Sequence, residues 1–173
     1  MELEIVEESV SEVTRRLWER SLNYRVEIVP SIPDEIRSLP CRGAAVEIAG
    51  AWEGLALLQT TPQLAIDVAC LMFDLPRLHS SSPERPASHQ KLHLPTLEMV
   101  QDCLKELTNI TAGNLKTALP EPCSLAIPKP LEFLHWDDFS FEGFILTQIA
   151  FLCEDFAPDA TYFRISLIKR GSG

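Results

Sequence analysis

The sequence lacks a long hydrophobic segment. None of its apolar runs approaches the ~20 residues that a membrane-spanning helix needs. The opening residues, MELEIVEESV, are acidic and lack the basic-then-apolar order of a secretory signal peptide. We therefore expect a cytoplasmic protein with no membrane partner.

The sequence is also short of positive charge. It has 15 Lys and Arg against 25 Asp and Glu, which gives a formal net charge of −10. Because proteins that bind nucleic acid present a basic surface to the phosphates, we expect no nucleic-acid partner. The 173 residues are enough for a sizeable hydrophobic core, and we predict one domain over residues 1–173.

The signatures of several common catalytic and metal sites are missing as well. There is no G-x-S-x-G nucleophile motif, no glycine-rich phosphate loop and no C-x-x-C pair. His89 and His93 are four residues apart, but they lie in a stretch rich in proline and serine, so we expect no metal site. The five cysteines are scattered, which favours reduced and mostly buried thiols. They are Cys41, Cys70, Cys103, Cys123 and Cys153.

Helical and extended patterns alternate along the chain. Apolar residues recur at helical spacing over Leu3–Arg20, which predicts an amphipathic helix. A short strand is expected around Tyr24–Val29. Residues Ala44–Thr60 read as a β-hairpin, with Gly50-Ala51 as a two-residue turn.

A second helix is predicted directly after the hairpin. Thr61 suits its N-cap and Pro62 its first helical position, and the pattern runs to about Phe73. Residues Asp74–Pro95 then form a long loop, because they are rich in proline and serine and have no periodic apolar signal. The inward-facing residues of the helix are expected to be Leu64, Val68, Leu71 and Met72.

The longest helix is predicted over Thr96–Ala118. An extended piece at Cys123–Ile127 and two strands, Phe141–Cys153 and Tyr162–Lys169, follow it. This order of elements predicts an α+β fold, in which helices pack on one side of a mainly antiparallel sheet.

The two faces of this longest helix differ in character. At about 100° per residue, Glu106, Asn109 and Gly113 fall together opposite the apolar face, and Asp102 lies one turn earlier on their side. A glycine inside a helix costs roughly 1 kcal/mol relative to alanine, and a closely approaching partner would explain it. A carboxylate and an amide three residues apart are also common on solvated helices, so the spacing alone leaves both readings open. The apolar face comprises Val100, Leu104, Leu107, Thr111, Leu115 and Ala118, with Cys103 and Ile110 beside it.

The residues around this polar set carry a more specific signal. The segment KELTNITAGNLKTAL resembles the signature helix of the CheC/CheX/FliY group of bacterial chemotaxis phosphatases. In that group a helix carries Glu-x-x-Asn followed by a Gly-Asn pair, which here are Glu106, Asn109 and Gly113-Asn114. The resemblance covers roughly Gly43–Pro128. Because the first helix contains no second Glu-x-x-Asn, the chain is most similar to single-motif, CheX-like proteins.

The resemblance implies a CheX/CheC-like fold and an activity. The family's substrate is the phosphoryl-aspartate of a CheY-like response regulator in chemotaxis-type, two-component signalling. Asn109 would orient the attacking water and Glu106 would dock onto a cation of the regulator, so these are the predicted catalytic residues. Asp102 and Gly113 would belong to the partner-binding surface. The protein would need no cofactor of its own, because the phosphorylated regulator supplies Mg²⁺.

Three points stay open on the sequence alone. The same fold and helix could serve a catalytically inactive, CheX-like binding or scaffold module. Asn114 reads as structural, either capping the helix or linking it to an adjacent element. Proteins of this group can form homodimers, and the last two strands would offer a sheet edge or face for one, unless both are internal to a single sheet.

Overall fold

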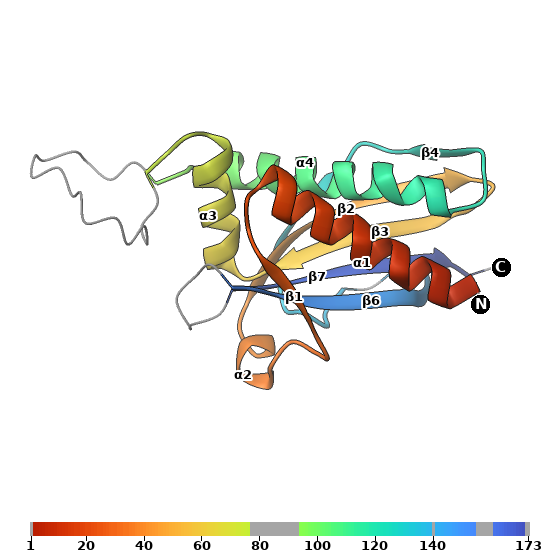
Figure 1. Cartoon of the computed structure of the whole chain (residues 1–173), viewed down its shortest axis with the longest axis horizontal. Helices are drawn as coiled ribbons and strands as arrows, with labels where there is room; N and C mark the ends of the chain where they lie inside the picture. The colour runs from red at the N-terminus through yellow and green to blue at the C-terminus, as the bar shows by residue number, and fades with distance from the viewer. Residues whose placement is uncertain (1, 77–93, 140, 155–160, 172–173) are drawn as a thin grey trace, which may run out of the picture.

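A computed structural model describes residues 2–76, 94–139, 141–154 and 161–171. Within them, seven strands form one sheet in which all neighbouring strands are antiparallel (Figure 1). Strands β1, β6, β7, β3, β2 and β4 lie side by side in that order, and β5 also pairs with β2. The strands are β1 (Val26–Val29), β2 (Cys41–Gly50), β3 (Gly54–Thr60), β4 (Cys123–Leu125), β5 (Lys129–Leu134), β6 (Gly143–Cys153) and β7 (Tyr162–Arg170).

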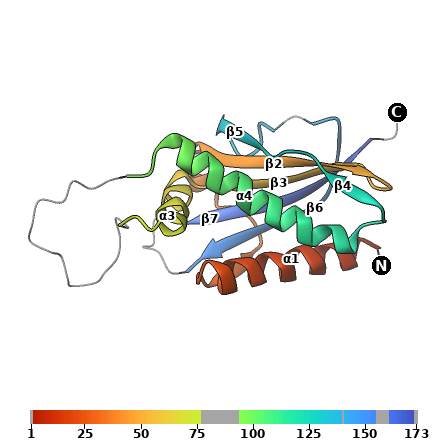
Figure 2. The same cartoon turned by 90° about the horizontal axis from the view of Figure 1, so that it is seen from above.

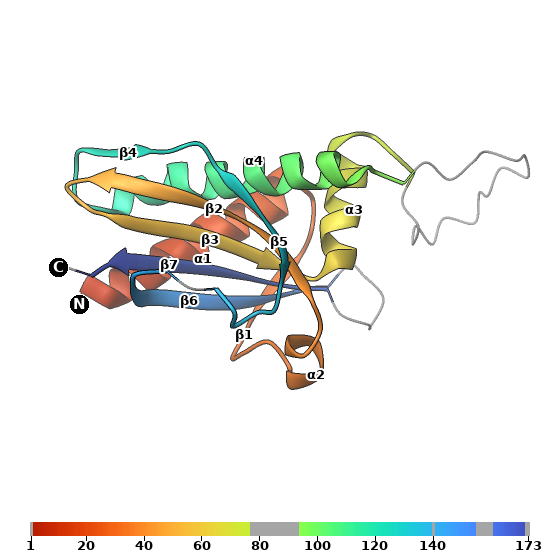
Figure 3. The same ribbon diagram turned by 180° about the vertical axis from the view of Figure 1, so that it is seen from behind.

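The long helices cover one face of this sheet. Helices α1 (Glu2–Ser21) and α4 (Leu97–Leu115) lie across the strands, and α3 (Pro62–Met72) packs against α4 at one end (Figures 1 and 2). The predicted α+β fold, with a mainly antiparallel sheet and helices on one side, is confirmed. A single-turn helix, α2 (Asp34–Arg37), belongs to the other side, visible in Figure 3, where Ile36 joins a separate small core.

Aromatic stacking fixes α1 to the sheet. The ring of Trp18 in α1 stacks on Phe163 of β7 with centroids 3.9 Å apart, and Phe163 stacks in turn on Phe151 of β6 at 4.7 Å. All three side chains are almost completely buried. Since a large aromatic side chain brings much apolar area into a core, this stack is a major stabilising element.

The last two strands are both internal. β7 pairs with β6 and β3, whereas β6 pairs with β7 along most of its length but with β1 only over Ala150–Cys153. Of the two alternatives for these strands, the internal arrangement is confirmed. Among the described residues, the Gly143–Ile149 part of β6 has no strand partner on its β1 side.

The connection between β2 and β3 differs from the predicted two-residue turn. The last paired residues of the hairpin are Ile48 and Gly54, and Gly50 pairs with Cys123 of β4. The physical reason is Trp52, which is buried and whose ring lies so close to Gly54 that no side chain would fit there. A two-residue turn is too short to bring this indole into the core.

Two elements of the structure were not predicted, the expected orientation of Met72 is wrong, and most of the predicted loop lies outside the described residues. Neither α2 nor β5 was predicted, and β5 carries Pro130, which an edge strand tolerates where its backbone N–H would need no partner. Met72 was expected to face inward, but it is 40% exposed because α3 ends there and leaves the core. Most of the predicted loop, residues 77–93 with His79, His89 and His93, lies outside the described residues.

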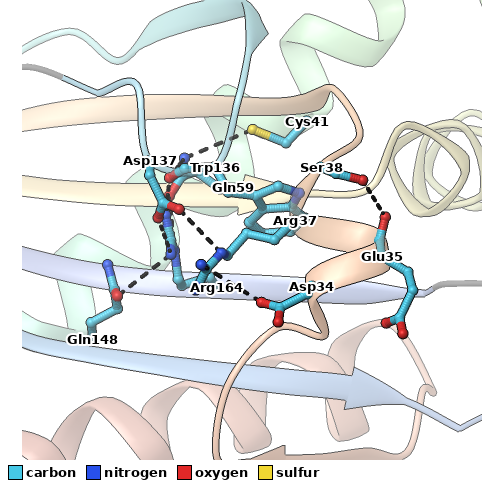
Figure 4. Close-up of polar contacts among 10 residues, drawn as sticks. All are labelled: Asp34, Glu35, Arg37, Ser38, Cys41, Gln59, Trp136, Asp137, Gln148 and Arg164. Atoms are coloured by element: carbon cyan, nitrogen blue, oxygen red, sulfur yellow. Dashed lines mark hydrogen bonds and ion pairs between the residues drawn. The ribbon is translucent and has the colours of Figure 1, made fainter.

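On the face of the sheet away from the long helices, one buried arginine ties distant segments together. Arg164 of β7 donates to Gln59 Oε1 from both Nε (3.0 Å) and Nη2 (2.8 Å), and from Nη1 to Asp137 Oδ1 (3.3 Å) (Figure 4). It also bonds the carbonyl of Trp136 and Oε1 of Gln148. All its N–H groups thus have acceptors, so Arg164 holds the segment after β5 against the sheet.

Replacement of Arg164 is expected to lower the stability of the fold strongly. Burial lowers the pKa of Arg164, and the hydrogen bond and charge of Asp137 oppose that effect. In Arg164→Met the buried Gln59 Oε1 loses its donors, so the free energy of unfolding should fall by about 3 kcal/mol in urea titrations. The matched control is Arg37→Met, which removes an exposed ion pair to the same Asp137 and should cost less than about 1 kcal/mol. Equal losses would contradict a special function of the buried network.

Candidate functional site

Helix α4 forms at the predicted place because its first turn is capped. Thr96 Oγ1 accepts the backbone N–H of Met99 at 3.2 Å, and Glu98 places negative charge in the first turn. The helix ends at Leu115 and is followed by a 3-10 turn over Lys116–Ala118. Two buried threonines are satisfied locally, since their hydroxyls donate to carbonyls one turn earlier in the helix. The buried residues of α4 are Val100, Cys103, Leu104, Leu107, Thr108, Thr111, Ala112 and Leu115.

The opposite face carries the four residues that the sequence singled out. Asp102, Glu106 and Gly113 are exposed, and Asn109 is half-buried between them. Glu106 and Asn109 lie one turn apart and line the same hollow. Among the described residues neither side chain has a hydrogen-bond or ion-pair partner, so both can accept one from outside.

The hollow around this pair is formed by three separate segments. It is open to solvent, has a volume of about 470 Å³, and lies where the end of α3, the middle of α4 and the link between β4 and β5 come together. The course of α3, of α4 and of the segment that joins β4 to β5 can be followed in Figure 2. Sequence reasoning found the α4 wall but missed the others, because they are brought together only by the fold. The lining residues from outside α4 are Met72, Phe73, Ile127 and Pro128.

Asp102 is exposed, but its carboxylate already has an ion-pair partner. Its Oδ1 lies 2.6 Å from Nζ of Lys105, one turn further along α4. Within the described lining of the hollow, Lys105 is the single cation, and this ion pair engages it. Glu106 therefore contributes the one uncompensated charge in the lining, and that charge is negative.

Comparison with protein families agrees with this helix and its surroundings. The family model described as "Chemotaxis phosphatase CheX" matches residues 42–132, a span that includes the whole of α4. The chain belongs to the CheX family. This membership supports a chemotaxis phosphatase role for the chain. No curated protein matches it significantly.

Solved structures show how closely the fold follows this family. The chemotaxis protein CheX from Vibrio vulnificus aligns with a TM-score of 0.63 at 15% identity, covering 94% of this chain and 95% of that one. CheX in a CheX–CheY–BeF3–Mg complex from Borrelia burgdorferi aligns at 0.62 with 19% identity and 99% of both chains. FliY from Thermotoga maritima aligns at 0.56 with 18% identity, covering 95% and 88%. At these identities the likeness establishes the fold.

Two findings narrow the chemistry available in the hollow of this CheX-family chain. Cys103 contributes to the lining, but it is buried, and burial, followed by the charge of Asp102, raises its pKa to about 11. Its thiol is therefore protonated at neutral pH and a poor nucleophile. Among the described residues, no three His, Cys, Asp or Glu side chains are placed to share a metal ion.

In the described part of the chain, no helix has the length and hydrophobicity to cross a membrane.

Asn114 is structural, but its contacts are local. Its Nδ2 donates to the carbonyl of Ile110 at 2.9 Å, and its own carbonyl accepts the hydroxyl of Thr117 at 2.8 Å. Of the two alternatives, a link to an adjacent element is not among these contacts, and both contacts lie at the C-terminal end of α4, where Asn114 is exposed. It contributes to the end of α4 and not to the hollow.

Gly113 has no packing reason to be glycine. A Cβ placed there would have no atom within 4 Å, whereas at Gly43 it would collide with the backbone of Leu58. Gly113→Ala should therefore raise the free energy of unfolding by about 1 kcal/mol in urea titrations, since alanine is the better helix former. The control Gly43→Ala should lower it. A destabilised Gly113→Ala variant would mean that the glycine serves the fold and not a partner.

Proposed function

We propose that this protein is a phosphatase that accelerates hydrolysis of the phosphoryl-aspartate of a CheY-like response regulator. The observation that carries the proposal is the placement of Glu106 and Asn109. They lie one turn apart on a helix, line an open hollow and are unpaired among the described residues. Membership of the CheX family supports the same activity.

Asn109 suits the positioning of water. Its amide offers both a donor and an acceptor, so it can hold a water molecule in line with the phosphorus without taking its proton. Hydrolysis of an acyl phosphate depends mainly on positioning and charge stabilisation, so one well-placed amide can contribute a large rate effect. A carboxylate at this position would instead repel the anionic phosphoryl group.

Glu106 suits docking. Its carboxylate is the uncompensated negative charge of the hollow, and it would pair with a cation near the phosphorylated aspartate, such as a lysine of the regulator. One charge-assisted contact there would fix the register of the helix and so place Asn109 against the phosphoryl group. In this mechanism the regulator brings Mg²⁺, which neutralises charge on the phosphoryl oxygens, and a CheX structure has been solved with CheY, BeF3 and Mg.

Asn109→Ala is expected to lose turnover while keeping the partner. The plateau rate of regulator dephosphorylation, measured with the phosphatase in excess, should fall roughly 100-fold, with little change in the concentration that gives half the plateau. Asn109→Asp should lose at least as much through charge repulsion. Asn114→Ala removes a nearby amide outside the hollow and should keep near-normal activity. A full-rate Asn109→Ala variant would exclude its assignment as the water-positioning residue.

Glu106→Ala is expected to lose docking and turnover together. The half-saturating concentration should rise at least about tenfold, and this loss should shrink at high salt because a charge pair is involved. Glu98→Ala removes another exposed acid of α4 that does not line the hollow, and it should behave as wild type. If both variants lost activity equally, the general charge of the helix would explain the effect and Glu106 would have no special function.

The same assay separates the enzyme from a scaffold. A regulator that binds the wild-type protein tightly but loses its phosphoryl group no faster would make this chain a catalytically inactive CheX-like binding module. Acceleration that depends on Asn109 would establish the phosphatase.

A further inference from the structure

We propose that the apolar rim of the hollow, formed by Met72, Phe73 and Ile127, is the surface that recognises the response regulator. The rim would contact apolar side chains next to the phosphorylated aspartate, while Glu106 and Asn109 reach the aspartate itself. This inference rests on the proposed function and extends it, because it assigns partner affinity to residues outside the Glu-x-x-Asn helix.

The three rim residues are apolar, yet each is well exposed to solvent, which is unfavourable for an apolar side chain. Ile127 is 85% exposed, Phe73 44% and Met72 40%. Single exposed apolar side chains are ordinary, but these three, from two distant segments, line one hollow together with the proposed catalytic pair. Apolar groups around a few polar ones are the usual composition of a protein-binding centre, where the apolar contacts exclude water from the polar ones.

The charge of the hollow decides which occupant fits. Lys105 is already paired with Asp102, and Glu106 leaves one negative charge without compensation. A free phosphate or a small phosphorylated metabolite would therefore meet repulsion and no available cation among the described residues of this lining. A phosphorylated regulator brings positive charge with it, in Mg²⁺ and a lysine, so it is complementary to the carboxylate as well as to the rim.

The rim is placed to act on affinity rather than on chemistry. Met72 and Phe73 end α3, and Ile127 lies between β4 and β5, so each projects from a segment that packs beside α4 and not from α4 itself. Contacts that are equal in the ground state and the transition state change half-saturation and leave the plateau rate unaltered. Their replacement should therefore be kinetically distinct from that of Asn109.

The experiment measures binding of a purified CheY-like regulator, loaded with Mg²⁺ and beryllofluoride, to variants of the full chain. Ile127→Ser and Phe73→Ser should each weaken binding about tenfold, and the loss should be the same at low and high salt because no charge is removed. In the dephosphorylation assay they should raise half-saturation by the same factor with an unchanged plateau. Leu39→Ser replaces an apolar residue of similar exposure (51%) that does not line the hollow, and it should bind as wild type.

The outcomes separate this inference from the proposed function. If the wild-type protein binds the regulator and accelerates its dephosphorylation, but the rim variants bind equally well, the rim has no part in recognition and the phosphatase assignment stands. If the rim variants weaken binding and the wild-type protein does not accelerate dephosphorylation, the chain is a docking module that uses this surface. Failure of the wild-type protein to bind any regulator of its organism would overturn both. Unfolding midpoints equal to that of the wild type exclude misfolding as the cause of lost binding.

Discussion

The packing of α4 on β2 is the interaction on which the candidate site depends. The buried face of α4 includes Leu104 and Leu107, and Thr108 donates from its hydroxyl toward the carbonyl of Ala44 in β2 at 3.5 Å. Since each residue turns the helix by about 100°, a shift of one residue in this packing would carry Glu106 and Asn109 away from the hollow. The core therefore sets the orientation of two side chains that have no partner among the described residues.

Helix α4 contains several residues that are weak helix formers, and they fall into two groups. Thr108 and Thr111 are tolerated inside because each hydroxyl bonds a carbonyl of the preceding turn. Asn109 has no such hydrogen bond among the described residues, and a Cβ at Gly113 would have no atom within 4 Å. Residues that lower helix stability without improving the packing are expected where a protein meets a partner. Here they lie on the same side of α4.

Periodicity was enough to predict which residues of α4 face away from the core, because helix geometry is local and Leu97–Leu115 is long and capped. The rest of the hollow could not be predicted in that way. Ile127 and Met72 are distant from α4 in sequence, and Met72 continues the apolar pattern of α3 into a turn where the helix has left the core. The Arg164 network was equally hidden, since Gln59, Trp136 and Gln148 become its neighbours only through strand pairing and the return of the chain after β5.

In the described lining of the hollow Glu106 is uncompensated and Lys105 is paired with Asp102, and under the proposed function this imposes a condition on the substrate. Under the proposed function, a phosphoryl group would have to enter the hollow with its charge already neutralised, since Glu106 would repel an anion. A protein that holds Mg²⁺ beside its own phosphoryl-aspartate meets this condition, whereas a free phosphate ester does not. The one cationic side chain in the described lining, Lys105, is paired with Asp102, so under the proposed function the hollow would select against free phosphate esters. On the further proposal, the exposed apolar residues of the rim would supply affinity for such a partner.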